Sequence, residues 1–306
     1  MLRMYHTCPS CVKSTAPIAW KLDQCEAKFS SNSTPLHDLD SDSEAVLGRQ
    51  HRNPASKRSL EPGGKYRAIC KLFVTFDGAS KEATGWCFTE SGIIATAGHC
   101  VYDEEYGRAL AIEAHISYHG ADSDLRKTHE VRMAVNVAVH RGWYDGFLKH
   151  NDIAIITLRT PFDEATPLKW GNCPVRGEKV TLRVVGYPLD IPGGREGQYM
   201  YESTGPTDWD LEQNDMLIHR LDTFLGSPVF HLREDQELVV IGVHVGTGKI
   251  PRPTTDGLGS GRTGKLYRVN KAVAIGHMSN NFDILRQAIE CFVLQQTSQA
   301  AVSIAL

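Results

Sequence analysis

The apolar residues of this chain gather in many short runs that turn residues separate. From Tyr66 onward the runs are rich in Val, Ile and Tyr, and Gly, Pro and Asp stand between them. Several alternate with period two, so that one face of each strand is apolar, as for Val239, Ile241, Val243 and Val245. The runs read CKLFVTF, GIIATAG, AIEAHISYH, VRMAVNVAVH, DIAIITL, KVTLRVVGY, LVVIGVHV and KLYRVN. This pattern predicts an all-β fold.

The number of strands indicates two barrels rather than one. Strands spread over about 200 residues suit two small β-barrels packed together. Helical segments do not alternate with the strands, which disfavours a parallel sheet with crossover helices. Near the C-terminal end, Asn280 and Asn281 can cap a helix, and apolar residues follow them at spacings of three and four. These residues are Ile284, Leu285, Ala288, Ile289 and Phe292.

The two ends of the chain lack the strand pattern. Residues 1–64 are polar without a sustained period, and the stretches SSNS, DLDSDSE and EPGG are typical of loops. We therefore expect residues 1–64 to be a disordered pro-segment or tail. Residues 65–295 should form the folded domain with its C-terminal helix, and residues 296–306 a second tail.

Composition excludes several classes of partner. The chain has 306 residues, of which 41% are hydrophobic and 23% are charged, and its formal net charge is -3. No stripe of Lys and Arg predicts nucleic-acid binding, and no run of about 18 apolar residues predicts a membrane span. A lone CxxC at Cys8 and Cys11 is a weak match to a zinc site. We expect a monomer with no metal, no cofactor and no nucleic-acid or membrane partner.

The strongest local signal surrounds His99, in the segment GWCFTESGIIATAGHCVYD. The strand-like run GIIATAG leads directly to this histidine, and the end of a strand can hold an imidazole rigidly. Cys87 and Cys100 stand on either side of the loop, and we expect a disulfide between them. Cys70 and Cys173 are candidates for a second bridge, although sequence alone does not establish the pairing of eight cysteines.

A carboxylate follows at a suitable place in the chain. Asp152 precedes an apolar strand in HNDIAIITL. A histidine that acts as general base needs a carboxylate on its other ring nitrogen, which sets its tautomer and orientation. The segment LDTFLGSPVF then supplies Ser227, so the chain carries His, Asp and Ser in that order.

These segments together resemble the glutamyl endopeptidase family of trypsin-like serine proteases. The resemblance runs from about Ala45 to Ile289, and its further matches are AVLGRQHR, YRAICKLFVTF, GYPLDIPGG, YESTG, LDTF, GSPVF and VIGVHVGTG. It implies a chymotrypsin-like double β-barrel, His99 as general base and Asp152 as the residue that orients it. It also implies secretion and protein or peptide substrates, although the N-terminus has no long apolar stretch typical of a signal peptide.

The serine segment departs from the family pattern, which reads Asp-Thr-x-x-Gly-x-Ser-Gly-Ser-Pro-Val. Here Phe224-Leu225 runs directly into Gly226-Ser227, so three residues are missing. In one alignment the nucleophile is absent and Leu225 takes its place. In the other Ser227 is the nucleophile, and Pro228 stands where the family has glycine. Both alignments shorten the turn that aims the hydroxyl and the backbone donors of the oxyanion hole.

The specificity pocket is better preserved. His244 in GVHVG matches the histidine with which the family holds an acidic side chain of the substrate, and Thr223 matches its threonine partner. A buried carboxylate needs a donor or a positive charge, and an imidazole with a hydroxyl supplies both.

The sequence therefore predicts a serine endopeptidase that cleaves after Glu or Asp through an acyl-enzyme. An alternative is a catalytically impaired pseudoprotease that binds acidic peptides through Thr223 and His244. A third interpretation is an active enzyme whose serine turn has been lost at a misassigned exon boundary.

Overall fold

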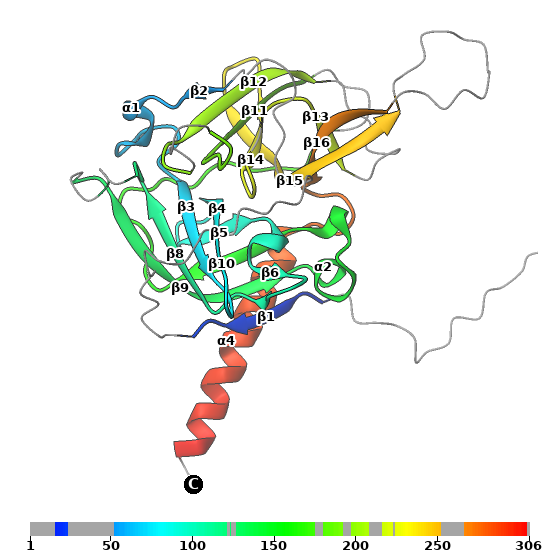
Figure 1. Ribbon diagram of the computed structural model, residues 1–306. Coiled ribbons are helices and arrows are strands. Elements are labelled where there is room, and N and C mark those ends of the chain that lie inside the picture. The colour runs from blue at the N-terminus through cyan, green and yellow to red at the C-terminus, as the bar shows by residue number, and fades with distance from the viewer. Residues whose placement is uncertain are drawn as a thin grey trace, which may run out of the picture.

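The computed structural model describes residues 16–23, 52–120, 123, 127–174, 180–191, 197–207, 216–222, 224–251 and 266–304. Two antiparallel sheets lie one above the other, and a long helix runs along the side of the first (Figure 1). This arrangement is the chymotrypsin-like one that the sequence predicted. The first sheet comes from residues 18–158, and all but one strand of the second sheet come from residues 180–274.

Six strands of the first sheet close into a barrel. Their order is β9-β10-β5-β4-β3-β8, and pairing of β8 with β9 closes the circle. Alternation places residues such as Leu72, Ile94 and Ile156 inside the barrel, where they are fully buried. The strands are β3 (Ile69–Thr75), β4 (Ser80–Cys87), β5 (Ile93–Thr96), β8 (Ala111–Ile116), β9 (Glu130–Val139) and β10 (Ala154–Leu158).

The second sheet has seven strands in the order β13-β16-β15-β14-β11-β12-β2. Among the residues that the structure describes, no pairing joins its two ends. Leu182, Val184 and Phe224 lie in its own apolar core, whereas Val185 belongs to the core shared with the first barrel. The strands are β2 (Asn53–Pro54), β11 (Val180–Gly186), β12 (Tyr201–Thr207), β13 (Leu217–His219), β14 (Pro228–Leu232), β15 (Leu238–Pro251) and β16 (Leu266–Ala274).

Short elements fill the connections. The pair β6 (Tyr102–Asp103) and β7 (Gly107–Arg108) forms a small hairpin. The helices of the connections are α1 (Lys57–Leu60), η2 (Gly98–Cys100), α2 (Arg141–Gly146) and η4 (Lys149–Asn151).

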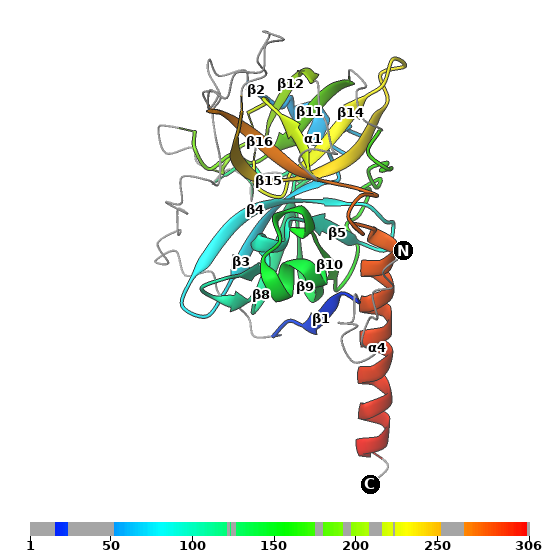
Figure 2. The same cartoon turned by 90° about the vertical axis from the view of Figure 1, so that its right-hand side faces the viewer.

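The C-terminal helix α4 (Phe282–Ile304) confirms the predicted helix and its cap. The Asn281 side chain accepts a hydrogen bond of 2.7 Å from the backbone N–H of Asp283. Phe282, Leu285 and Ile289 are buried, and the helix packs against β9, β10 and the N-terminal strand β1 (Ile18–Lys21). Ile284 is exposed, so the buried face is narrower than the sequence indicated. Figure 2 shows the helix continuing past the barrel. None of the described helices has the length and apolarity that crossing a membrane requires.

The expected disorder of residues 1–64 is wrong for two segments. Strand β1 pairs with β9 beyond the part of β9 that β8 occupies, and β2 pairs with β12. Trp20 of β1 is buried, so packing and a ladder of hydrogen bonds order this short strand. The expected tail at 296–306 is likewise helical up to Ile304.

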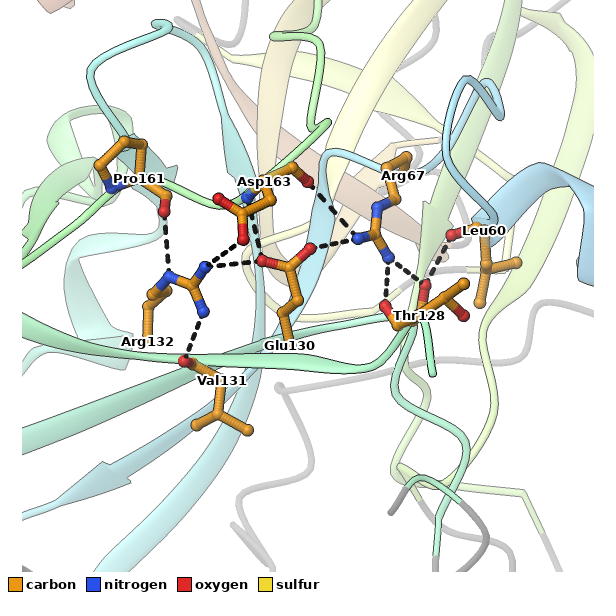
Figure 3. Close-up of polar contacts among 9 residues, drawn as sticks. Leu60, Arg67, Thr128, Glu130, Val131, Arg132, Pro161 and Asp163 are labelled. Atoms are coloured by element: carbon orange, nitrogen blue, oxygen red, sulfur yellow. Dashed lines mark hydrogen bonds and ion pairs between the residues drawn. The ribbon is translucent and has the colours of Figure 1, made fainter. Parts of the chain in front are cut away.

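A network of ion pairs ties the first barrel to the chain that leads to the second sheet (Figure 3). The buried Arg67, just before β3, donates to the carboxylate of Glu130 at the start of β9. Glu130 also accepts from Arg132 at 2.7 Å and from the backbone N–H of Asp163 at 2.9 Å. Arg132 donates from Nε to the carbonyl of Pro161 at 2.9 Å. The network therefore fixes the segment after β10.

Candidate active site

His99 and Asp152 meet because two paired strands place them at the same end of the first barrel. Strands β5 and β10 are antiparallel, with Thr96 opposite Ala154. The residues that follow Thr96 and those that precede Ala154 therefore emerge side by side. His99 Nδ1 lies 2.8 Å from Asp152 Oδ2, and the His99 backbone N–H donates to Asp152 Oδ1, also at 2.8 Å.

Close packing holds this pair. A Cβ atom on Gly98 would lie 2.9 Å from Asp152 Oδ1 and 2.7 Å from Trp143 Cδ1, so a larger residue could not occupy this position. The Trp143 ring lies edge-on to His99, with centroids 6.3 Å apart. The neighbouring Asn151 donates to the Met278 carbonyl at 2.9 Å, which anchors the aspartate loop to the segment before α4.

The electrostatics of the pair favour a charged imidazole. Burial alone would lower the pKa of His99, but the charge of Asp152, aided by Cys100 and by the hydrogen bonds to both, raises it well above the ordinary value. Asp152 is fully buried, whereas 16% of the His99 side chain is exposed. Because Asp152 occupies Nδ1, only Nε2 is left to exchange protons with a reacting group.

The expected disulfide between Cys87 and Cys100 is wrong, because both residues are free thiols. Cys87 lies on β4 next to Cys70, and burial raises its pKa to about 12. The Cys100 Sγ instead lies 3.5 Å from His99 Nε2. Cys70 and Cys173 are free as well, so the second candidate bridge is also absent.

Ser227 lies in the interface between the two sheets. Its side chain is fully buried, and by hydrogen-bond geometry its Oγ has no partner among the described residues. This oxygen faces Gly186, since a Cβ atom there would come within 2.1 Å of it. The preceding Leu225 accepts a hydrogen bond of 3.0 Å from the backbone N–H of Thr84 on β4. The short turn thus rests directly on the first barrel.

The structure describes one of the two predicted specificity residues. Thr223 lies outside the described residues. His244 on β15 is fully buried, and it is close enough to His99 for the charge of that residue to act on it. Burial, followed by His219 and His99, lowers the pKa of His244 well below its ordinary value, and contact with the Lys271 backbone offsets this in part.

Sequence reasoning missed one residue of this region, His219 on β13. Its ring meets that of His244 at 5.7 Å between centroids and an angle of 67°. Burial lowers the pKa of His219 to about 3. No motif surrounds this residue in MLIHRL, so only the position of an imidazole in an apolar run could have drawn attention to it.

Comparison with solved structures agrees with the fold. A Glu endopeptidase bound to MPD superposes with a TM-score of 0.55 at 20% identity, over 80% of this chain and 99% of that one. The protease Anisep from Arthrobacter nicotinovorans gives a TM-score of 0.53 at 16% identity, over 73% of this chain and 93% of the other. The thermostable serine protease AL20 gives 0.51 at 16% identity, over 69% and 92%.

Comparison of the sequence with known proteins and with family profiles gave two different results. No curated protein sequence matches the chain. The profile of the trypsin-like peptidase domain, however, matches residues 83–243, which is just over half of the 306 residues. The matched segment contains His99, Asp152 and Ser227 and ends one residue before His244. The chain therefore belongs to the family of trypsin-like peptidases.

Proposed function

We propose that the protein is a serine endopeptidase that hydrolyses peptide bonds after Glu or Asp. The observation that carries this proposal is the His99–Asp152 pair, with 2.8 Å between Nδ1 and Oδ2. In this scheme Ser227 attacks the carbonyl carbon, the unprotonated form of His99 takes the serine proton and passes it to the leaving amine, and water then releases the acyl group. Asp152 keeps the imidazole in the required tautomer.

The acid preference is assigned to His244, with Thr223 as its partner. A buried imidazole of lowered pKa is neutral in the free protein, and the arrival of a carboxylate favours its protonated form. A Gln side chain has nearly the shape of Glu but brings no charge. The contrast between Glu and Gln peptides therefore isolates the contribution of charge to recognition.

A second candidate is a pseudoprotease that binds acidic peptides without cutting them. The burial of Ser227 favours this candidate, because the buried hydroxyl faces Gly186. His99 Nε2 contacts the Cys100 thiol, at 3.5 Å, rather than a serine hydroxyl. In a comparable triad, loss of the nucleophile costs a factor of about 10⁶ in kcat.

One experiment separates the two candidates. Both cleavage and binding of a fluorogenic Glu peptide and of its Gln counterpart are measured for the unmodified chain and for Ser227→Ala. Ser203→Ala is the matched control, because Ser203, on β12 of the second sheet, is another buried serine whose Oγ has no described partner. Cleavage that Ser227→Ala alone abolishes supports the peptidase. Tight binding of the Glu peptide without cleavage supports the pseudoprotease, and indifference to both peptides rejects the acid pocket.

We also propose that the protein acts outside the cell as a monomer. The proposal rests on the resemblance to glutamyl endopeptidases. Size-exclusion chromatography with light scattering and fractionation of expressing cells test the two parts separately.

A further inference from the structure

Two fully buried histidines face each other inside the second sheet. His219 lies on β13 and His244 on β15, and both strands pair with β16 from opposite sides. His219 stands opposite Asn270 and His244 opposite Ala272, so the two histidines are diagonal neighbours across one strand. Their rings meet edge to face, with 5.7 Å between centroids.

By hydrogen-bond geometry the ring nitrogens of both histidines have no partner among the described residues, and the Lys271 backbone is only the smallest of the influences on the pKa of His244. A buried polar atom that makes no hydrogen bond keeps the full cost of its lost hydration. Two neighbouring imidazoles therefore carry a large penalty in the free protein. Such a penalty is typical of a site that a ligand completes, because the ligand then supplies the missing partner.

The surroundings define the charge of that ligand. Burial keeps both imidazoles neutral, and the positive charge of His99 acts against a proton on His244. A cation would meet the repulsion of His99, whereas an anion would relieve it. A carboxylate that reaches His244 raises its proton affinity, because a buried negative charge needs a positive partner.

The contact between the two rings allows His219 to stabilise the protonated form of His244. A protonated imidazole is stabilised by a neutral aromatic ring across an edge-to-face contact, since the face of a ring carries partial negative charge. Protonation of both rings at 5.7 Å would instead place two like charges in a buried site. The pair therefore takes up at most one proton beyond its neutral state, which matches the single charge of one carboxylate.

We propose that His219 and His244 form one acid-recognition unit, in which His244 meets the carboxylate of a substrate Glu or Asp and His219 supports the proton that this binding recruits. His219 is thus a positioning residue for specificity. The inference rests on the proposed acid preference and adds to it a residue that the sequence did not reveal.

The test measures binding of a Glu peptide and of its Gln counterpart by calorimetry, in buffers of different ionisation enthalpy that report proton uptake. The variants are His219→Phe, which keeps a ring and removes the nitrogens, and His219→Gln, which keeps a polar group. His115→Gln in the first barrel is the matched control. Thermal unfolding monitors folding, and His219→Gln carries the test if the Phe variant does not fold.

The unmodified chain should bind the Glu peptide more tightly than the Gln peptide and take up one proton only with Glu. His219→Phe should reduce the Glu-to-Gln ratio about tenfold, equivalent to 1.4 kcal/mol, and reduce proton uptake, without changing the affinity for Gln. If the unmodified chain does not distinguish the peptides, the acid preference itself is wrong. If it does and both His219 variants keep its ratio and proton uptake, the acid preference stands and the role of His219 is refuted.

Discussion

Asp152 accepts two hydrogen bonds from His99, one from ring Nδ1 and one from the backbone N–H, both at 2.8 Å. The imidazole ring therefore cannot rotate without breaking its hydrogen bond to Asp152, and the backbone hydrogen bond keeps the carboxylate in place. A carboxylate that is fully buried beside one imidazole acts on it with little screening. This relationship makes the protonation of His99 the most direct measure of the site.

Replacing Asp152 by Asn should lower the pKa of His99. The variant keeps the shape of the side chain but removes the charge that opposes the desolvation of the imidazole. An NMR titration of the His99 ring should show its midpoint moving down, and any peptidase activity should fall by about 10⁴. Asp145→Asn, which alters a partly exposed carboxylate on α2, is the control. An unchanged His99 midpoint in the Asp152 variant would contradict the assignment.

The His99–Asp152 pair should also make the free energy of unfolding depend on pH. The folded pKa of His99 lies above its unfolded value of 6.5. The pair therefore stabilises the fold fully below pH 6.5, and this contribution is lost as the pH rises through the folded pKa. Urea unfolding of the unmodified chain and of Asp152→Asn across this range should converge at high pH. Curves that stay parallel at all pH values would show that the pair adds no proton-linked stability.

His219 and His244 should make the stability of the fold depend on pH in the opposite direction to His99. Their folded pKa values lie below 6.5, and that of His219 is about 3. The unfolded chain therefore binds protons that the folded chain excludes, so stability is complete above pH 6.5 and falls as the pH decreases toward 3. His219→Phe should reduce the loss of stability between about pH 7.5 and pH 5. A variant of the partly exposed His277 is the control and should keep the full loss.

Much of this architecture could be predicted from the sequence. The period-two strands gave the class of fold, and the position of His99 after one strand and of Asp152 before its neighbour brought the two together. Strand β1 could not be predicted, because four residues in a polar segment carry no pattern and gain order only by pairing with β9. His219 escaped for a related reason, since only the order of β13, β16 and β15 reveals what lies beside it.

The thiols show the limit of reasoning from spacing. Cys87 and Cys100 flank the histidine loop in the sequence, but the side chain of Cys100 turns to His99 Nε2 at 3.5 Å. Among the described cysteines, exposed Cys291 should react first with a thiol reagent in the native protein, while burial protects Cys70, Cys87 and others until unfolding. Peptide mapping by mass spectrometry measures this order. A crosslinked Cys87–Cys100 peptide in an unreduced digest would contradict the free thiols.

The Glu130 network should contribute strongly to stability. Glu130 accepts from two arginines and a backbone N–H, so Glu130→Gln leaves the buried Arg67 without its charge partner. Breaking one partner of a buried ion pair costs about 3–5 kcal/mol of unfolding free energy. Asp163→Asn removes an exposed pair with Arg132 instead and should cost less than about 1 kcal/mol. Equal losses for the two variants in urea unfolding would show that burial does not distinguish these pairs.

The short serine turn is held at several points, so it cannot simply move Ser227 toward His99. The Ser227 backbone N–H donates to the Phe224 carbonyl at 3.0 Å. The Ser227 carbonyl accepts from the backbone N–H of His244 at 2.9 Å. Gly226 has a φ of 75°, and a Cβ atom there would lie 2.3 Å from the Thr84 carbonyl oxygen. These contacts keep the hydroxyl in the interface between the sheets.

Inserting three residues between Phe224 and Gly226, to create a Gly-x-Ser turn, should therefore raise cleavage of the Glu peptide greatly. Three residues add up to about 10 Å of chain, enough to carry a hydroxyl out of the interface, and a nucleophile must come within about 2.6–3.2 Å of its base. The control is the same insertion with Ala in place of the new Ser, which lengthens the turn but supplies no nucleophile. If only the serine insertion cleaves, the missing turn limits activity. If the unmodified chain already cleaves equally well and Ser227→Ala abolishes it, Ser227 is the nucleophile and leaves its buried position when substrate binds.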